Sequence, residues 1–261
     1  MQNPTSLPLI LQKTADFLKV HWQKVLFVVL IVYTPFNAVM SFFPAEGPAA
    51  GDDFQLWRNA GAVSLSQTLK GFAGILVSLA LAVLVEAHTR NENVSLKEVL
   101  LRSLKRLPVA FGTILVTSIL VGLLFLALIV PGVMFTIFWM FALTAVALRG
   151  VSFFGALSYS KALVKGRWWK TFGYALVLML IGGVIAVAAG SLGGIFASVI
   201  SGLIPFQPVF RLFNILVFTF VDLTQTFITA GLVFFFLQWE ETRGPGALPA
   251  IGGVNVPPAA I

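Results

Sequence analysis

The sequence predicts an all-α integral membrane protein with six transmembrane helices and three amphipathic helices in the membrane interface. Three features of the composition predict this class: 58% of the 261 residues are hydrophobic, 25 are phenylalanine, and the mean hydropathy is +0.96. Only 10% of the residues are charged, compared with about 25% in soluble proteins. Such a chain carries more apolar surface than a soluble domain could bury. Residues 1–243 are expected to form one transmembrane domain, followed by a flexible tail over residues 244–261.

The charged and reactive residues limit the classes of function. The net charge is +7, but the basic residues stand between long apolar runs, which excludes a nucleic-acid partner and favours anionic lipid headgroups. The chain has no cysteine, so disulfides and thiolate chemistry are excluded. Its ten acidic residues form no paired carboxylates and no metal cluster. The sequence therefore argues against an enzyme, a metal ion or a cofactor.

The membrane spans follow from the apolar runs, because a bilayer core about 30 Å thick requires roughly 20 apolar residues per helix. The first run, Val25 to Phe43, is nearly of spanning length and lacks a clear cleavage site, so we interpret it as a retained helix. The fourth span is short and the fifth long, so we expect either to tilt or to contain a break. The six predicted spans are Lys24 to Phe43, Leu65 to His88, Val109 to Val130, Gly132 to Leu148, Thr171 to Ile200 and Phe213 to Gln238.

Lysine and arginine predict the orientation, since they are enriched in cytoplasmic flanks. One side of the spans has only Arg58 and Arg211, together with Glu46, Asp52 and Asp53. Both termini are therefore expected on the opposite, cytoplasmic side. The basic residues of that side are Lys13, Lys19, Lys24, Arg90, Lys97, Arg102, Lys105, Arg106, Arg149, Lys161, Lys165, Arg167, Lys170 and Arg243.

Three segments of the cytoplasmic side have the apolar periodicity of amphipathic interfacial helices. They run from Leu7 to Trp22, from Ser95 to Leu107 and from Ser152 to Gly166. Ser95 and Glu98 form a capping box that starts the second helix, and Gly166 is expected to end the third. Each helix leads directly into a predicted span.

The junctions between these helices and the spans resemble one another. They read LKVHWQKVLF from Leu18, LKRLPVAF from Leu104 and VKGRWWKTFG from Val164. One interpretation is a three-fold internal repeat of interfacial helix, span, outer turn and span. The alternative is that any cytoplasmic flank accumulates lysine, arginine and tryptophan.

The outer connections are predicted to differ. Phe43 to Gly61 is expected to be a polar loop, and Pro131 with Gly132 a tight hairpin turn. Ser201 to Arg211 contains two prolines among apolar residues and is expected to be irregular. Gly190 and Gly194 have the G-x-x-x-G spacing that allows close helix packing, within the bundle or between subunits.

The last span carries a polar stripe, and ionisable groups in a membrane are candidates for function. Asp222 is its centre, with Gln225, Thr226 and Thr229 on following turns and Lys70 in the second span. These residues form either a proton, ion or ligand site, or a structural contact in which Asp222 pairs with Lys70. The structural interpretation is favoured, because no second carboxylate lies at comparable depth.

Two further sets of residues are assigned to the membrane interface. Glu86 and His88 are expected to reach the cytoplasmic interface, and His21 lies on an interfacial helix, so the two histidines predict no metal site. Basic and tryptophan residues are expected to contact lipid headgroups. These are Lys105, Arg106, Lys165, Arg167, Trp168, Trp169 and Lys170.

The segment from Leu126 to Gly173 carries a resemblance to a known family. Its features are Pro131 and Gly132 after an apolar run, Phe138 and Trp139 in an aromatic-rich span, Gly150, Ser160 and the junction Lys165 to Trp169. In these it resembles the membrane domain found next to some glycerophosphoryl diester phosphodiesterases and related six-span bacterial proteins. The resemblance implies a bacterial inner-membrane protein. It implies no activity, because the phosphodiesterase chemistry of fused members belongs to a separate soluble barrel, for which this chain has no room.

Two functions are therefore compared. The first is a non-catalytic scaffold or accessory subunit that organises membrane lipids, partner membrane proteins or further copies of itself. The second is a transporter or channel for an ion or for a hydrophobic or lipid-like substrate, with Asp222 in the pathway. The small number of polar residues in the spans favours the first.

Overall fold

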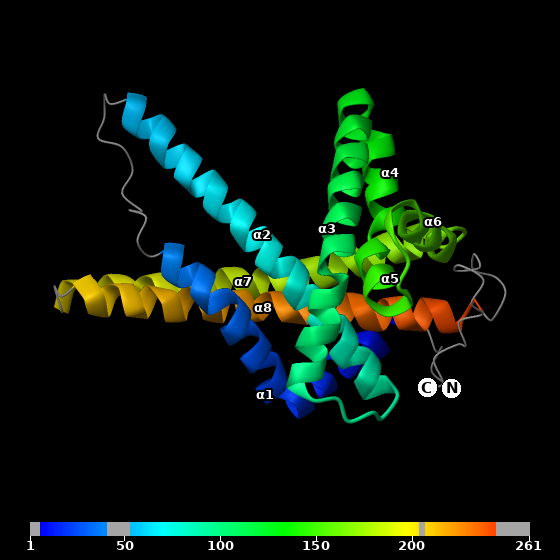
Figure 1. Cartoon of the computed structure of the whole chain (residues 1–261), viewed down its shortest axis with the longest axis horizontal. Coiled ribbons are helices and arrows are strands. Elements are labelled where there is room, and N and C mark those ends of the chain that lie inside the picture. Colours follow the sequence, from blue (N-terminus) through cyan, green and yellow to red (C-terminus); the bar gives the residue numbers. More distant parts are fainter. Residues whose placement is uncertain (1–5, 41–52, 204–206, 244–261) are drawn as a thin grey trace.

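The computed structural model describes residues 6–40, 53–203 and 207–243, which are mostly helical and contain no strand (Figure 1). The all-α class is confirmed for these residues, and the predicted tail over 244–261 lies outside them. The helices are α1 (Leu7–Met40), α2 (Asp53–Thr89), α3 (Leu96–Ala127), α4 (Ile129–Trp139), α5 (Ala142–Arg149), α6 (Phe153–Val164), α7 (Trp168–Leu203) and α8 (Gln207–Glu241).

Five helical stretches within the described ranges are long and apolar enough to cross a membrane, consistent with an integral membrane protein. The predicted count of six is not confirmed, since α1 is not among these five; residues 41–43 of the predicted first span lie outside the described residues. The five stretches are Lys70–Thr89, Leu96–Ala127, Ile129–Arg149, Trp168–Ile200 and Arg211–Glu241.

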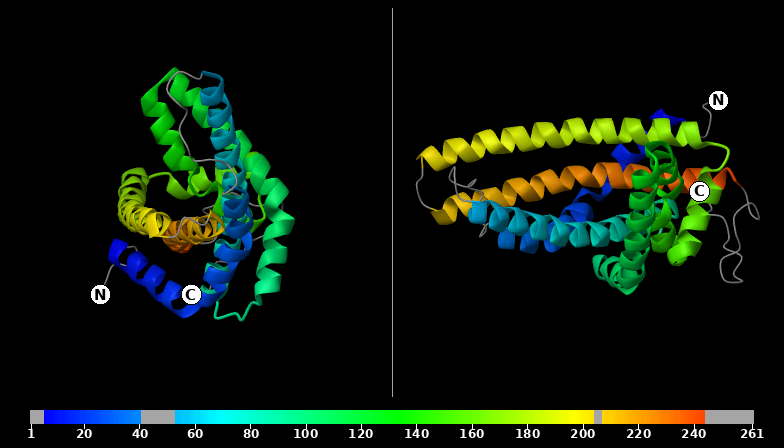
Figure 2. Two further views of the ribbon diagram at one scale, coloured as in Figure 1. Left: turned by 90° about the vertical axis from the view of Figure 1, so that its left-hand side faces the viewer. Right: turned by 90° about the horizontal axis from the view of Figure 1, so that it is seen from above.

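The helices share a base and leave it as separate arms. The base is the buried cluster that includes Val85, Ala145, Leu163, Phe235 and Trp239. The long arm is the pair of α7 and α8, which lie side by side, and the short arm is the pair of α3 and α4, which points across the long arm (Figures 1 and 2). The arrangement of the two arms therefore differs from a parallel bundle.

The three predicted junctions have three different structures. α1 kinks at His21, where the backbone is non-helical, at the predicted end of the first interfacial helix. α3 starts at the predicted cap, with the Glu98 amide donating to the Ser95 hydroxyl at 3.2 Å, but it continues through Pro108 without a break. α6 is a separate helix, followed by Gly166 in the left-handed conformation (φ 80°). The three-fold repeat is not confirmed.

The sequence predicted a turn at Pro131 and Gly132, but the turn between α3 and α4 lies at Leu128. Leu128 has extended dihedrals (φ −160°, ψ 135°). Pro131 lies in the first turn of α4, the one part of a helix that tolerates a residue without an amide hydrogen. Gly132 has a packing role, since a Cβ there would lie 2.6 Å from the Phe125 ring.

Two other predicted connections are shorter than expected. α2 begins at Asp53, within the segment predicted as a loop up to Gly61. α8 begins at Gln207, inside the segment predicted to be irregular up to Arg211. Pro208 lies in the first turn of α8, where proline does not disrupt the helix.

The break expected in the fourth or fifth span lies in the fourth, between α4 and α5. Ser160 of α6 forms hydrogen bonds with the backbone groups that lack a helical partner at this break. Its hydroxyl accepts from the Phe141 amide at 3.1 Å and donates to the Phe138 carbonyl at 2.7 Å. Because Ser160 is fully buried, this exchange replaces the helical hydrogen bonds that the break removes.

Glycines set the distance between α7 and α8. A Cβ at Gly182 or Gly193 would lie 2.2 or 2.3 Å from a side-chain atom of α8, whereas a Cβ at Gly190 or Gly194 would meet nothing within 4 Å. Gly182 and Gly193 are three helical turns apart and lie on one face of α7. The G-x-x-x-G pair singled out in the sequence is therefore not the one that packs against α8.

Candidate functional site

The polar cluster around Asp222 joins three helices. The Lys70 ammonium lies 2.8 Å from Oδ1 of Asp222, and the Asn37 amide donates to Oδ2 at 2.9 Å. The same amide nitrogen lies 3.1 Å from the Thr219 hydroxyl. The Asp222 side chain is 7% exposed and that of Lys70 27%. Asp222 and Lys70 thus form the pair that the structural interpretation anticipated, with Asn37 as a partner that the sequence did not reveal.

Aromatic rings complete the surroundings of the ammonium group. The Lys70 Nζ atom lies 5.9 Å from the ring centroids of Tyr33 and Phe218. A cation at this distance from an aromatic face is attracted by the ring quadrupole. The charge of Lys70 is therefore compensated by one carboxylate and two rings, which lowers the cost of placing it in an apolar region.

The predicted polar stripe on α8 divides between two surroundings. Asp222 and Thr226 are buried, and the Thr226 hydroxyl donates to the Leu223 carbonyl of its own helix. Gln225 and Thr229 instead line a pocket of about 500 Å³. Two residues of the stripe therefore lie in buried contacts between or within helices, and the other two line the pocket.

We call this pocket the membrane pocket, and residues of five helices line it. Its volume falls in the range of small-molecule sites. Its twelve lining residues come from α1, α2, α3, α5 and α8 and are mostly apolar or aromatic: Tyr33, Thr68, Gly71, Phe72, Gly74, Ile75, Ser78, Phe111, Ile114, Leu143, Gln225 and Thr229.

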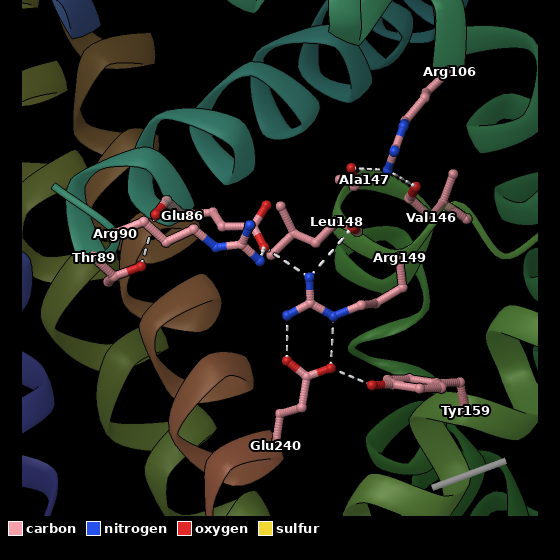
Figure 3. Close-up of polar contacts among 10 residues, drawn as sticks. All are labelled: Glu86, Thr89, Arg90, Arg106, Val146, Ala147, Leu148, Arg149, Tyr159 and Glu240. Atoms are coloured by element: carbon pink, nitrogen blue, oxygen red, sulfur yellow. Dashed lines mark hydrogen bonds and ion pairs between the residues drawn. The ribbon is translucent and has the colours of Figure 1, made fainter. Parts of the chain in front are cut away.

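A second polar cluster, the base cluster, centres on Arg149 (Figure 3). The guanidinium donates from Nη1 to Glu86 at 2.7 Å and binds both carboxylate oxygens of Glu240, at 2.7 and 2.5 Å. The Tyr159 hydroxyl also donates to Glu240. The Arg149 side chain is only 2% exposed. One buried cation therefore ties together α2, α5, α6 and α8.

The base cluster corrects two sequence-based assignments. Arg149 was expected to be a flanking charge at the interface, and Glu86 to reach the interface without forming a site. Arg149 is buried in this cluster and Glu86 is partly buried in it, because the ends of α2, α5 and α8 converge on one point of the base. The available signal was the position of Glu86, Arg149 and Glu240 at the ends of apolar stretches. Nothing in their spacing along the chain indicated that they meet.

Burial raises the pKa of the Tyr159 phenol, and the hydrogen bond to the Glu240 carboxylate adds to this effect. The phenol therefore remains protonated and can only act as the donor in this contact. Arg106 approaches the base cluster from α3 and donates to the carbonyls of Val146, at 2.8 Å, and Ala147. It thereby satisfies carbonyl groups near the end of α5.

A third cluster, the junction, lies between α6 and α7. Gly166, Arg167, Trp168, Trp169 and Lys170 line a pocket of about 480 Å³. Trp169 is 78% exposed, while the Trp168 indole donates to a backbone carbonyl of α4 at 3.2 Å. Arg167 donates to the hydroxyl and carbonyl of a threonine that follows α8.

The predicted headgroup contacts therefore differ in their exposure. Lys105, Lys165 and Lys170 are exposed. Arg106 is turned inward onto α5, so its guanidinium is already engaged. Burial, together with the nearby Arg243, lowers the pKa of Arg167. Positive charge is thus in excess at the junction, and an anion there would reduce the repulsion between the two arginines.

The two histidines meet near the kink of α1. Nε2 of His21 lies 3.0 Å from Nδ1 of His88, and the ring of Phe17 packs against both. Among the described residues, no group of three or more histidine, cysteine, aspartate or glutamate side chains could hold a metal ion. His88 thus pairs with His21 and joins α2 to α1; its position at the interface stays a prediction.

No protein-family model, curated protein or solved structure matches this chain. The resemblance to the membrane domain of glycerophosphoryl diester phosphodiesterases stays a prediction. The function therefore has to be argued from the three clusters and from the two pockets.

Proposed function

We propose that this chain is a non-catalytic integral membrane protein that organises anionic lipids at the cytoplasmic face of a bacterial inner membrane, as a scaffold or accessory subunit for partner membrane proteins. The observation that carries the proposal is the junction pocket, in which four of the five lining residues are arginine, lysine or tryptophan. Basic side chains attract anionic headgroups, and indoles prefer the headgroup level of a membrane.

The surroundings of the junction agree with this role. Lys165 and Lys170 are exposed, and the exposed Trp169 offers an apolar surface beside them. The guanidinium of Arg167 is oriented by its hydrogen bonds to Thr242 and lies 5.1 Å from the Trp239 ring centroid. A lipid phosphate at this place would meet charges that are partly fixed in position, which reduces the entropy lost on binding.

Transport through Asp222 is less well supported. A carboxylate in a transport pathway has to exchange its partner during the cycle. Asp222 is instead paired with Lys70 and Asn37 in a closed contact between α1, α2 and α8. These contacts favour a structural role for the polar cluster around Asp222.

The proposal is tested by measuring which lipids the protein retains. Protein reconstituted in nanodiscs with equal amounts of phosphatidylcholine and phosphatidylglycerol is released and weighed by native mass spectrometry. Lys165→Glu with Lys170→Glu removes two cations, each contributing about 1 kcal/mol, so retention of phosphatidylglycerol is expected to fall roughly thirtyfold.

The matched control is Lys19→Glu with Lys97→Glu, which makes the same charge change at exposed lysines of α1 and α3. This variant is expected to retain phosphatidylglycerol like the unmodified protein. Equal loss in both double variants would mean that only net charge matters, and the junction would not be a lipid site.

A further inference from the structure

The membrane pocket contains polar groups that form no hydrogen bond within the described part of the chain. The Tyr33 hydroxyl, the Ser78 hydroxyl and the Gln225 side-chain amide hydrogen-bond no described residue. Their neighbours in the pocket wall include the rings of Phe72 and Phe111, whose centroids are 4.8 Å apart. Polar groups in an apolar region without water are costly unless a partner satisfies them.

We propose that the membrane pocket binds a neutral lipid whose head carries a hydroxyl group. The three unsatisfied groups can each donate or accept a hydrogen bond, so a hydroxyl head can pair with more than one of them. The apolar body of such a lipid would lie against the aromatic rings. The pocket is one of those that small molecules typically occupy, mostly apolar with a few convergent polar groups.

The charges beside the pocket explain why the ligand is neutral. Lys70 and Asp222 precede Gly71 and Gln225 on the same two helices, and they neutralise each other at 2.8 Å. Lys70 and Asp222 therefore offer a charged head no free counterion among the described side chains of the pocket, since the ammonium is already paired with the carboxylate. This site is separate from the anionic-lipid site proposed at the junction and does not depend on it.

A glycine offers a way to fill the pocket without disturbing the fold. Gly71 lines the pocket, and a Cβ at this position would meet nothing within 4 Å. Gly71→Leu should therefore occupy the space of the ligand. The matched control is Gly122→Leu, because Gly122 is exposed on α3, also has open space, and does not line the pocket.

The experiment uses hexadecanol that carries a diazirine, added to the full-length protein in nanodiscs and activated by light. Peptide mass spectrometry then locates the labelled residues. Labelling is expected on the pocket segments of α2 and α8, and Gly71→Leu should remove most of it while Gly122→Leu leaves it unchanged. The junction variant Lys165→Glu with Lys170→Glu should also leave it unchanged, which separates this proposal from the previous one.

Two comparisons test the chemistry of the head. The hexadecanol probe is expected to label the pocket about fivefold more than a hexadecane probe with the same diazirine, and Gln225→Leu should reduce this preference. The hexadecanol probe should also label the pocket more than the corresponding fatty-acid probe. Equal labelling by the alcohol and the alkane, stronger labelling by the acid, or unchanged labelling in Gly71→Leu would each overturn the proposal.

Discussion

The base and the long arm use opposite means of holding helices together. In the base, large side chains such as Phe235 and Trp239 are almost fully buried, and Arg149 is enclosed by carboxylates. In the long arm, apolar side chains such as Val187 and Leu203 are 69% and 76% exposed, and the helices meet at glycines. The base is therefore stabilised by its own packing and ion pairs, whereas the arm requires apolar surroundings.

We therefore expect the stability of the arms to depend on the surrounding lipid, and the stability of the base to depend on its own packing and ion pairs. The cluster around Asp222 is intermediate in burial between the base and the arms. It joins α1, α2 and α8, and its Asp222 side chain is buried while that of Lys70 is 27% exposed. The following experiments separate these regions by the size of the effect on the free energy of unfolding, measured by SDS titration in mixed micelles.

The largest effect is expected for Arg149→Met. Removing the guanidinium leaves the buried carboxylate of Glu240 without its cation, whereas the partly buried Glu86 keeps its pair with Arg90. Loss of one partner from a buried pair costs about 3 to 5 kcal/mol. The control is Arg102→Met, which removes an exposed pair with Glu98 on one helix, worth about 0.3 to 0.5 kcal/mol. Comparable losses for both variants would contradict the central role of the base cluster.

A smaller loss is expected for Lys70→Met. It leaves the Asp222 carboxylate with Asn37 as its remaining partner, and the cost should lie between the values for exposed and buried pairs, about 1 to 3 kcal/mol. Combining it with Asp222→Asn should restore part of the lost free energy, since no unpaired charge remains. If the double variant is as unstable as the sum of the single variants, the two residues are not coupled.

Glycine substitutions test the long arm. Gly182→Ala should destabilise the protein by about 1 to 3 kcal/mol, because its Cβ would overlap a side chain of α8. Gly190→Ala should be neutral or stabilising by up to about 1 kcal/mol, since alanine favours the helix and the space is open. Equal effects of the two alanines would contradict the observed face of contact.

The smallest effect is expected from pH. Burial, followed by the charges of His88 and Lys24, lowers the pKa of His21 below its ordinary value of about 6.5. The folded state thus favours neutral His21, so this contribution to stability is present above pH 6.5 and is lost as the pH falls through the lowered pKa. Hydrogen exchange in α1 near His21 is expected to accelerate in acid, and His21→Gln should reduce this change; burial also lowers the pKa of His88, which still titrates in the variant.

Local features of the fold could be predicted from the sequence because they depend on neighbours along the chain. The Ser95 cap, the stop at Gly166 and the end of the first interfacial helix near His21 are of this kind. The turn at Pro131 and Gly132 was predicted wrongly, because proline also suits the first turn of a helix and glycine also permits close packing. The residue type alone did not distinguish these uses.

The candidate site could be predicted from the sequence only in part. Asp222 was identifiable because an intramembrane carboxylate is rare, and its pairing with Lys70 was one of two stated interpretations. Asn37 was missed, since an amide in a first span carries no comparable signal. The membrane pocket could not be anticipated, because five helices contribute to its wall.

The sequence by itself determined that this is an apolar, helical chain with basic junctions, because composition and periodicity are properties of consecutive residues. Only the tertiary structure decided that Glu86, Arg149 and Glu240 form one cluster, that Gly182 and not Gly190 contacts α8, and that the arms point in different directions. These outcomes depend on which helix faces meet. That choice is made by side-chain packing and charge pairing between segments far apart in the chain.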